Sequence, residues 1–360
     1  MVYVIAEVGV NHNGDCELAH KFVEAAKQAG ANAVKFQLFE PDKVATEYAP
    51  LADYQAVDSS DSNQNLLLRD LEIRHDCIRS LIQRCNYFGI DFLCTPFDLS
   101  SFYFLTDEMK QPTIKVSSGD ISNFPFLFKV GQRRVQLLLS TGASDIDDIR
   151  VALGFYFSGY LNLPAPTDLQ TAIRIFDSHH LEDPFSRVVL FHCVSQYPAP
   201  ADSLNLLAIN TLKRSFPNQR IGFSDHSIGP MASLLALALG VEFLEKHITF
   251  DTSAKGPDHS SSMSIHDFQQ LIDSLRLANL ALGGDTKQMT YAEKEVRPKV
   301  RRGIYFSRDI SAGETIQEDD LVPLRPETQT DTMIFFSAIG KVLRVNVSRH
   351  QALEENMVTD

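Results

Sequence analysis

Residues 2–12 read VYVIAEVGVNH, an apolar run that contains one glutamate and ends in a polar turn. Val2–Val8 has the length and the β-branched content of a strand that is buried on both faces. In a doubly wound, open parallel sheet, the turn after the first strand usually carries the phosphate-binding pattern G-x-G-x-x-G. Here the turn reads VGVNH over residues 8–12 and lacks that pattern. The first strand therefore favours a closed barrel over an open sheet.

Apolar runs continue to alternate with amphipathic helical segments up to about residue 285. The first helical segment, residues 16–29, places Leu18 and Phe22 on one face and stops at Gly30. Eight strand–helix units of this size fit the α/β class and predict a (β/α)8 TIM barrel over residues 1–285. The other strands are expected at residues 33–38, 90–94, 113–116, 135–139, 187–193, 220–223 and 241–245, and the last barrel helix at 264–282.

Two segments depart from this alternation. Residues 154–186 are too long for a plain connection between strands five and six, so we expect an extended helix plus an insertion. Residues 286–300 are rich in charge and contain Pro298, which predicts a linker. Beyond it, residues 301–360 hold short β-like runs and a turn at Ala312-Gly313-Glu314, which indicates a small, separate, β-rich domain.

Composition and charge exclude several classes of protein. A formal net charge of -13 argues against a nucleic-acid binder, which needs a basic face. The apolar N-terminus lacks the basic region of a signal peptide, and no apolar run is long enough to span a bilayer. The five cysteines are far apart, odd in number and without a C-x-x-C pair, which predicts reduced core thiols. We therefore expect a cytoplasmic protein that binds neither nucleic acid nor membrane.

Polar residues stand near the C-terminal end of nearly every expected strand. A parallel strand that is buried on both faces should be apolar, and a charged residue in it must face the barrel mouth or be desolvated at high cost. Because TIM-barrel active sites lie at this end, the pattern predicts an active site there. The residues are Glu7, Lys35, Gln37, Thr95, Asp98, Lys115, Ser117, Ser118, Asp120, Ser140, Thr141, His192, Ser195, Tyr197, Ser224, Asp225, His226, Glu245, Lys246 and His247.

Two of these residues, Lys35 and Lys115, admit more than one interpretation. One of them could form a Schiff base, as in an aldolase, if burial lowers its pKa. Alternatively, both bind a phosphate or carboxylate, supported by hydroxyl groups on neighbouring strand ends. The many hydroxyl groups favour anion binding, and a purely structural Lys35–Glu7 ion pair remains a third possibility. The hydroxyl groups belong to Thr95, Ser118, Ser140 and Ser224.

His226 and His247 end adjacent expected strands, so their imidazoles can converge. Two histidines with open coordination positions suit a divalent metal that must also hold substrate and water. The alternative is that each is an ordinary core histidine whose ring nitrogens are hydrogen-bonded. After strand eight, the turn that contains Asp258 leaves the active-site end of the barrel, so this carboxylate is positioned to reach a substrate hydroxyl. We expect no ligand role for His12, His192 or His259. The same holds for the pair His179-His180, which lies in the insertion and is expected to face solvent.

Taken in order, the motifs resemble those of the sialic acid synthase family, which includes N-acetylneuraminate, legionaminic acid and pseudaminic acid synthases. The tail, residues 301–360, looks like the antifreeze-like (SAF) domain of that family and includes Arg325-Pro326 and Ile339-Gly340-Lys341. The matching runs are IAEVGVNHNGD (5–15), AVKFQ (33–37), TPF (95–97), KVSSGD (115–120), STG (140–142), GFSDHS (222–227), EKH (245–247) and GPDH (256–259).

The resemblance implies condensation of phosphoenolpyruvate with an open-chain, N-acylated amino sugar to give a nine-carbon 2-keto sugar acid and phosphate. It also implies a divalent metal, most commonly Mn2+ with Mg2+ or Co2+ possible, held by His226 and His247 to polarise the sugar aldehyde. Asp120 matches a carboxylate that manages the attacking water. Phosphoenolpyruvate-binding positions match Lys35, Thr95, Lys115, Ser118, Ser140 and Ser224, and sugar-side positions match Glu7, Ser195, Tyr197 and Asp258.

The family forms domain-swapped homodimers, in which the arginine that matches Arg325 reaches the other subunit's site and contacts the N-acyl group. The chain departs from the family pattern at several positions. Asp120 stands where some members have glutamate, Ser195 where some have asparagine, and residues 327–330 replace a glycine-containing loop. The sequence leaves two candidates for the acceptor sugar, N-acetylmannosamine and a 6-deoxy diacetamido sugar. The alternatives are a Schiff-base aldolase that acts through Lys115 and a non-catalytic carbohydrate-binding homologue.

Overall fold

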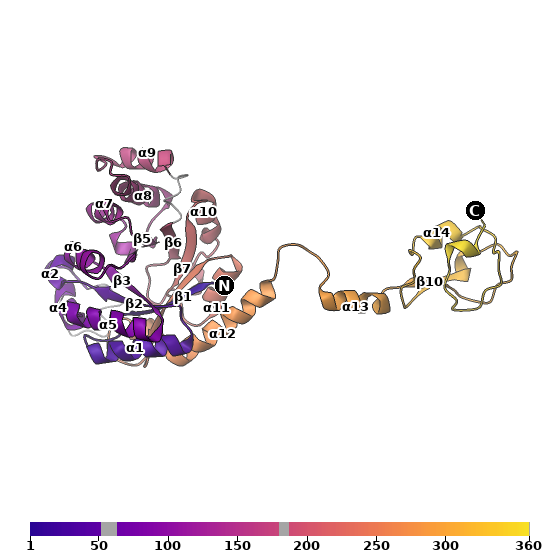
Figure 1. Ribbon diagram of the computed structural model, residues 1–360, viewed down its shortest axis with the longest axis horizontal. Helices are drawn as coiled ribbons and strands as arrows, with labels where there is room; N and C mark the ends of the chain where they lie inside the picture. The colour runs from indigo at the N-terminus through magenta and orange to yellow at the C-terminus, as the bar shows by residue number, and fades with distance from the viewer. Residues whose placement is uncertain (52–62, 180–186, 360) are drawn as a thin grey trace. The chain divides into compact units, whose positions relative to one another are not determined.

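The computed structural model describes residues 1–51, 63–179 and 187–359 (Figure 1). The chain divides into two compact units, Met1–Gly283 and Gly284–Asp360. Among the described residues, no helix has both the length and the apolarity needed to cross a membrane.

The first unit is a barrel of eight parallel strands. Ladders join the strands in the order β3-β2-β1-β8-β7-β6-β5-β4, and β3 packs against β4 to complete the ring. The expected TIM barrel is therefore confirmed, and an open doubly wound sheet is excluded. The strands are β1 (Tyr3–Gly9), β2 (Ala33–Leu38), β3 (Asp91–Pro96), β4 (Thr113–Val116), β5 (Gln136–Ser140), β6 (Val188–Cys193), β7 (Arg220–Asp225) and β8 (Phe243–Thr249).

Helices surround the strands, as Figure 1 shows. Helices such as α1 bury one apolar face against the strands, α1 with Phe22 and Ala26. A separate apolar layer fills the barrel interior and includes Ile5, Leu138 and Phe191. The helices are α1 (Cys16–Ala29), α2 (Pro41–Val44), α4 (Gln64–Leu71), α5 (His75–Phe88), α6 (Leu99–Tyr103), α7 (Phe124–Gln132), α8 (Ile146–Tyr160), α9 (Leu169–His179), α10 (Ala208–Ser215), α11 (Met231–Ala238) and α12 (Ile265–Leu282).

The long segment between β5 and β6 contains two helices in its described part, one more than a single barrel unit needs. After α8 the chain forms α9, which buries Ala172 and Phe176. The two helices touch so closely at Gly154 that a Cβ there would lie 2.1 Å from the carbonyl oxygen of Ala172. This contact explains the glycine in a helix interior. His179 ends α9 and is half-buried, and its neighbour His180 lies outside the described residues.

Two of the five cysteines contradict the expectation of free thiols. Cys16, at the start of α1, and Cys77, in the first turn of α5, form a disulfide bond with a Cα–Cα distance of 5.9 Å. Helices α1 and α5 pack against each other, which brings together two cysteines that are 61 residues apart in sequence. Cys85, Cys94 and Cys193 are free and buried.

The second unit has its own small core, which includes Phe306, Ile316 and Leu353. Strands β10 (Gly303–Phe306) and β11 (Leu321–Leu324) pair antiparallel, and α14 (Ile334–Ala338) follows them. Residues 286–300, expected to be a linker, include helix α13 (Tyr291–Val300). Thr290 caps this helix in a reciprocal pair with Glu293, a capping-box signal that our sequence analysis overlooked.

Candidate active site

A cavity of about 440 Å3 opens at the C-terminal ends of the barrel strands. Residues two apart on a strand face the same side, so Ser224 and His226 on and just after β7, and Glu245 and His247 on β8, all line it. Of the site residues expected from sequence, those that line the cavity are Glu7, Lys35, Thr95, Lys115, Ser118, Ser140, Ser195, Tyr197, Ser224, His226, His247 and Asp258.

Four buried charged groups form the floor of this cavity. The Nζ atom of Lys35 lies 2.6 Å from Oε2 of Glu7 and 3.6 Å from Oε2 of Glu245. The Nζ atom of Lys115 donates to both carboxylate oxygens of Glu245, at 2.9 and 2.8 Å. Each lysine therefore has a glutamate partner, and the Lys35–Glu7 pair considered from sequence is present. Two lysines and two glutamates thus balance each other in charge at the buried floor of the cavity.

Hydroxyl groups extend this cluster on both sides. Lys35 donates to Oγ1 of Thr95 at 3.3 Å, and the Ser224 hydroxyl donates to Glu245 at 2.8 Å. Burial alone would lower the pKa of Lys35, but attraction to Glu245 and Glu7 outweighs it and raises the pKa. Burial lowers the pKa of Lys115 despite the attraction of Glu245.

Glu245 and Gln37 line the cavity, and both belong to the expected set of polar strand-end residues, although neither was assigned a role of its own. Glu245 joins the two lysines, and its position two residues before His247 in a buried strand was the signal that would have identified it. Gln37 stands two residues after Lys35 and donates to Oε1 of Glu7 at 3.4 Å. Both residues follow the inward-facing alternation of their strands.

The rings of His226 and His247 lie beside each other at the cavity wall, with centroids 5.5 Å apart. The ring of Tyr197 packs on both imidazoles, with its centroid 4.1 Å from that of His226 and 5.9 Å from that of His247. Nδ1 of His226 lies 2.7 Å from the carbonyl oxygen of Val194. Because a carbonyl only accepts, this nitrogen carries a proton, and Nε2 is the atom that could bind a metal once the ring is neutral. Burial alone would lower the pKa of His226, but Cys193 and the Val194 carbonyl outweigh it and raise the pKa.

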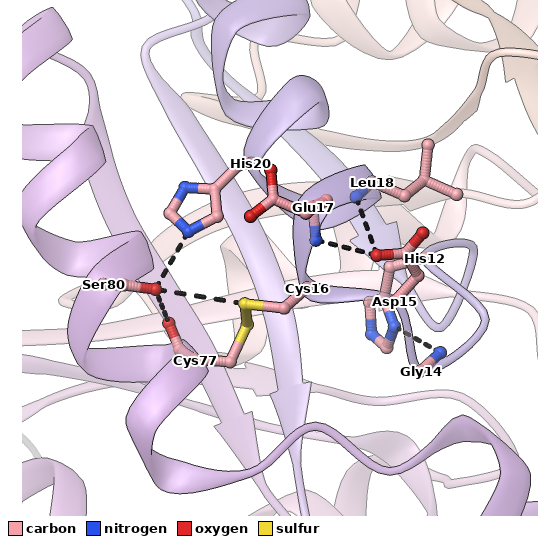
Figure 2. The surroundings of a disulfide bond; sticks show 9 residues. All are labelled: His12, Gly14, Asp15, Cys16, Glu17, Leu18, His20, Cys77 and Ser80. Atoms are coloured by element: carbon pink, nitrogen blue, oxygen red, sulfur yellow. Dashed lines mark hydrogen bonds between the residues drawn. A yellow bond between two sulfur atoms is a disulfide. The ribbon is translucent and has the colours of Figure 1, made fainter.

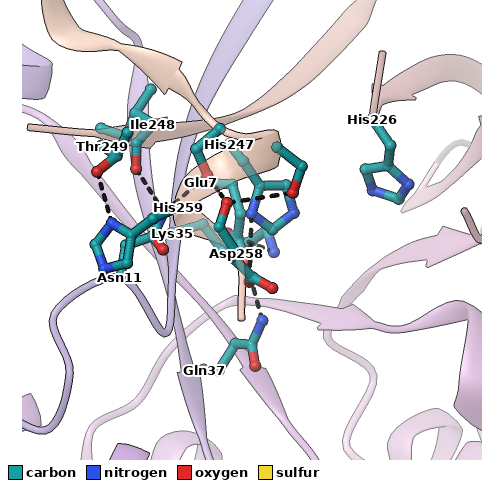
Figure 3. Close-up of polar contacts among 12 residues, drawn as sticks. Glu7, Asn11, Lys35, Gln37, His226, His247, Ile248, Thr249, Asp258 and His259 are labelled. Carbon is teal, nitrogen blue, oxygen red and sulfur yellow. Dashed lines mark hydrogen bonds and ion pairs between the residues drawn. The ribbon is translucent and has the colours of Figure 1, made fainter. Parts of the chain in front are cut away.

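His247 offers a lone pair. Burial lowers its pKa well below 6.5, so the imidazole is neutral. Its buried Nδ1 has no hydrogen-bond partner within the described part of the chain, and Oδ2 of Asp258 lies 3.6 Å away. Figure 3 shows His247, Asp258, Glu7 and Lys35 gathered at one end of the barrel, with His226 in the same view.

These observations fit a divalent metal. A metal-binding histidine uses one ring nitrogen as ligand while the other is fixed by a hydrogen bond, as His226 is by Val194. The unpartnered, buried nitrogen of His247 is the second available donor. Residues 1–51, 63–179 and 187–359 contain no group of three or more histidine, cysteine or acidic side chains arranged as a complete metal site. The protein would thus supply two imidazoles and leave positions open for substrate and water.

Asp258 lies in the connection that follows β8. It is buried, and burial together with the nearby Glu7 carboxylate raises its pKa to about 6. Ser262 donates to the backbone oxygen of Asp258 at 2.6 Å, and Asn11 donates to Oγ of Ser262 at 2.8 Å. Asn11 also donates to the carbonyl of Ile248 (Figure 3), so the connections after β1 and β8 hold each other in place.

Two expected site residues do not line the cavity. Asp120 ends a short 3-10 turn, Ser118–Asp120, where it accepts hydrogen bonds from Ser117 at 3.1 Å and Asn123 at 3.2 Å. Ser117 lines the cavity, whereas the Asp120 carboxylate stands behind it. Arg325 follows β11 in the second unit and is exposed there.

The expectation that every polar strand-end residue faces the barrel mouth is wrong for Asp225 and Lys246. They form a buried ion pair at 3.0 Å, and Ser233 of α11 donates to Asp225. They alternate with the inward-facing residues on their strands and therefore face the surrounding helices. The pair avoids the cost of burying a single charge, so it is structural.

Three of the five histidines for which we expected no ligand role, His12, His192 and His259, lie outside the cavity lining. Nε2 of His192 donates to the carbonyl of Leu204 at 2.8 Å, and Nδ1 of His259 lies 2.7 Å from Oγ1 of Thr249. Nδ1 of His12 accepts a hydrogen bond from the backbone of Gly14 at 3.0 Å.

Comparison with known proteins gives matches along the whole chain. The model of the NeuB family matches residues 22–287, and that of the SAF domain matches residues 301–359. The N,N'-diacetyllegionaminic acid synthase of Legionella pneumophila is 35% identical, over 96% of this chain and 91% of the relative. The enzyme of the same name from Campylobacter jejuni is 33% identical, over 98% of both chains. The N-acetylneuraminic acid (sialic acid) synthetase of Leptospira borgpetersenii, solved with citrate, superposes with a TM-score of 0.66 at 30% identity, over 82% of this chain and 89% of that one.

Proposed function

This chain belongs to the NeuB family, as its strand-end motifs predict, and we propose that it condenses phosphoenolpyruvate with an N-acylated amino sugar. The products are a nine-carbon 2-keto sugar acid and phosphate. One observation carries the proposal: a lysine–hydroxyl cluster and a pair of neighbouring imidazoles share one cavity. The first suits an anion and the second suits a metal that activates an aldehyde.

Phosphoenolpyruvate brings a phosphate and a carboxylate, and the cavity floor offers cationic and hydroxyl donors for both. Lys35 pairs with Glu7 and Glu245, and Lys115 pairs with Glu245, so an arriving anion competes for ammonium groups that are already in place. Preorganised charges of this kind bind without being reoriented. The hydroxyl donors are Thr95, Ser118, Ser140 and Ser224.

His226 and His247 would hold the metal. Mn2+ is our first choice, with Mg2+ or Co2+ as alternatives, because imidazole ligands suit transition metals better than Mg2+. When bound, the metal supplies Lewis-acid polarisation of the sugar aldehyde. The protein fixes the two donors by the Val194 hydrogen bond and by the packing of Tyr197 on both rings.

The sugar would lie on the side of Glu7, Ser195, Tyr197 and Asp258. Asp258, whose pKa is raised to about 6, still ionises at neutral pH and can accept a hydrogen bond from a sugar hydroxyl. Two relatives are named N,N'-diacetyllegionaminic acid synthase, which favours the 6-deoxy diacetamido sugar over N-acetylmannosamine as acceptor.

A domain-swapped homodimer completes the proposal. In this assembly Arg325 of one subunit would contact the N-acyl group of the sugar bound by the other. An exposed arginine is suited to a contact that forms only on assembly. We further propose a cytoplasmic location, where phosphoenolpyruvate is available.

The test is an assay of phosphate release from phosphoenolpyruvate by the full chain. Mn2+, Mg2+ and Co2+ are each supplied with a panel of N-acylated amino sugars, and the matching sugars without the N-acyl group serve as controls. We expect metal-dependent phosphate release with an acylated sugar only. Borohydride trapping of substrate on Lys115 would instead support an aldolase. The absence of phosphate release with every acylated sugar would contradict the proposal.

A further inference from the structure

The disulfide between Cys16 and Cys77, shown in Figure 2, joins the starts of α1 and α5, and each of these helices follows a segment that lines the cavity. Cys16 follows directly on the β1–α1 connection, which contributes Val10 to the cavity lining. Cys77 lies on α5, and the preceding helix α4 contributes Leu68 and Leu71. The bond therefore stands immediately behind this side of the cavity, which we call the α4 wall: residues 9–15 and 64–71.

Within the α4 wall the two segments touch closely. Gly14 has a φ of +72°, and a Cβ there would lie 2.7 Å from the carbonyl oxygen of Asp70 on α4. Val10 belongs to the same small apolar cluster as Leu67 and Leu71, separate from the main barrel core. A small cluster resists local opening less than a large core does. The disulfide is thus a covalent restraint on a part of the cavity whose apolar packing is a small cluster apart from the main core.

The two bonded cysteines are less buried than the three free ones. Cys16 and Cys77 are partly exposed, whereas Cys85, Cys94 and Cys193 are buried. Burial raises the pKa of the Cys85 thiol to about 12 and also raises that of Cys94, which suppresses their reactive thiolate forms. The Cys16–Cys77 pair is therefore better placed for exchange with a thiol from solution than Cys85 or Cys94 is.

Polar side chains beside the sulfurs can exchange protons with them. Oγ of Ser80 lies 3.9 Å from Sγ of Cys16 and donates to the backbone oxygen of Cys77 at 2.8 Å. Nε2 of His20, one turn after Cys16 on α1, lies 2.9 Å from the same hydroxyl. Figure 2 shows His20 and Ser80 next to the disulfide. A thiolate that leaves Cys16 thus has a hydroxyl–imidazole pair nearby to stabilise it or return a proton.

We propose that Cys16–Cys77 is a reversible thiol–disulfide site whose oxidised form braces the α4 wall. The co-reactant is a low-molecular-weight thiol. Its thiolate attacks one sulfur, breaks the S–S bond and forms a mixed disulfide, and a second thiol then displaces the first as a symmetrical disulfide. The two cysteines gain two electrons and two protons, and the two small thiols lose them. In a reducing compartment the site opens, and under oxidising conditions it closes.

The two states should differ in the cavity wall and not in the catalytic groups. Lys35, Lys115, Glu245 and His247 lie on barrel strands, which the disulfide does not join. Reduction should therefore loosen the α4 wall, raise KM and leave kcat nearly unchanged. This statement about kinetics rests on the proposed function, whereas the statement about local motion does not.

The first experiment counts thiols and measures local opening in the full chain. Alkylation of the unfolded protein should modify three cysteines after preparation with oxidised glutathione, and five after dithiothreitol. Hydrogen exchange of native protein should then become at least roughly tenfold faster in the α4 wall on reduction, because exchange reports local opening. Exchange in strands β7 and β8 should stay the same in both states.

The double variant Cys16→Ser/Cys77→Ser is the matched control, and dithiothreitol should leave its exchange unchanged. Should that variant fail to fold, reduction of the unmodified chain still decides the question. Five reactive cysteines after oxidation would overturn the proposal, as would equal α4-wall exchange in both states or an increase spread evenly over the barrel. If neither state releases phosphate from phosphoenolpyruvate, the proposed function fails while the exchange result remains valid.

Discussion

His226 and His247 occupy positions two residues beyond Ser224 and Glu245, and this spacing determines which side chains meet in the cavity. Side chains alternate along a strand, so the residues between them, Asp225 and Lys246, face outward and pair with each other. The sequence contains this alternation, and a strict period of two would have assigned both sets. Treating every polar strand-end residue as part of the site included the Asp225–Lys246 pair in error.

We expect that His226→Ala or His247→Ala lowers Mn2+ affinity by at least roughly 100-fold, the upper end of what loss of an outer-shell partner causes. The reason is that each variant removes one of two imidazole donors. Isothermal titration of the substrate-free protein with Mn2+ measures this without relying on activity. Circular dichroism checks that the barrel stays folded.

The matched control for these variants is His192→Gln. His192 lies outside the cavity lining and donates to the carbonyl of Leu204, a bond that glutamine can replace. This variant should bind Mn2+ like the unmodified chain. Unchanged Mn2+ affinity in both alanine variants would refute the assignment of the metal to this pair.

Among the elements, the β1–α1 connection carries a buried histidine that makes stability depend on pH. Burial lowers the pKa of His12 from its ordinary value of 6.5 to about 4. Between pH 4 and pH 6.5, His12 binds a proton in the unfolded chain but stays neutral in the folded chain. The free energy of unfolding therefore falls as pH falls from 6.5 to 4, by up to about 3 kcal/mol from this group. Above pH 6.5, His12 is neutral in both the folded and the unfolded chain, so it adds no pH dependence to the free energy of unfolding.

We expect His12→Asn to flatten this acid-induced loss, because asparagine accepts the Gly14 hydrogen bond through Oδ1 and does not titrate. Urea unfolding at pH 7, 6, 5 and 4 measures the difference. His266→Asn is the control, since His266 is exposed on α12 and its replacement should leave the slope unchanged. If the free energy of unfolding of His12→Asn depends on pH as that of the unmodified chain does, His12 is not the cause of the acid-induced loss of stability.

The elements show where sequence patterns were sufficient and where they were not. Residues 33–38 and 113–116 were assigned with the bounds that β2 and β4 have, because short apolar runs between turn residues identify buried strands. Helix α13 was missed because its charged residues indicate a linker unless the Thr290–Glu293 capping pair is considered. The Cys16–Cys77 bond was not predictable, since it depends on how α1 packs against α5.

At the scale of the whole molecule, the two units have separate hydrophobic cores. The barrel core is built from residues between Val2 and Leu275, and that of the second unit from residues between Ile304 and Val358. Among the described residues, no hydrophobic cluster contains members of both units. Domains with their own cores generally fold as independent units.

We therefore expect a chain that ends at Gly283 to fold into the same barrel, with the thermal unfolding midpoint of the barrel transition in the full chain. Its KM for the acylated sugar should rise roughly 10- to 100-fold, because a hydrogen bond from a charged group contributes about 1.5–3 kcal/mol. Its KM for phosphoenolpyruvate should change little, since Lys35, Lys115 and the hydroxyl donors belong to the barrel. Calorimetry and phosphate-release kinetics measure these quantities.

Arg325→Ala in the full chain separates the arginine from the rest of the second unit. If Arg325 is the contact to the N-acyl group, this single substitution should raise KM for the sugar as much as the truncation does, and Arg325→Lys should restore part of the affinity. If KM for the sugar rises in the truncated chain but not in Arg325→Ala, another part of residues 284–360 binds the sugar. Full sugar affinity in the truncated chain would show that the barrel binds the acceptor without the second unit.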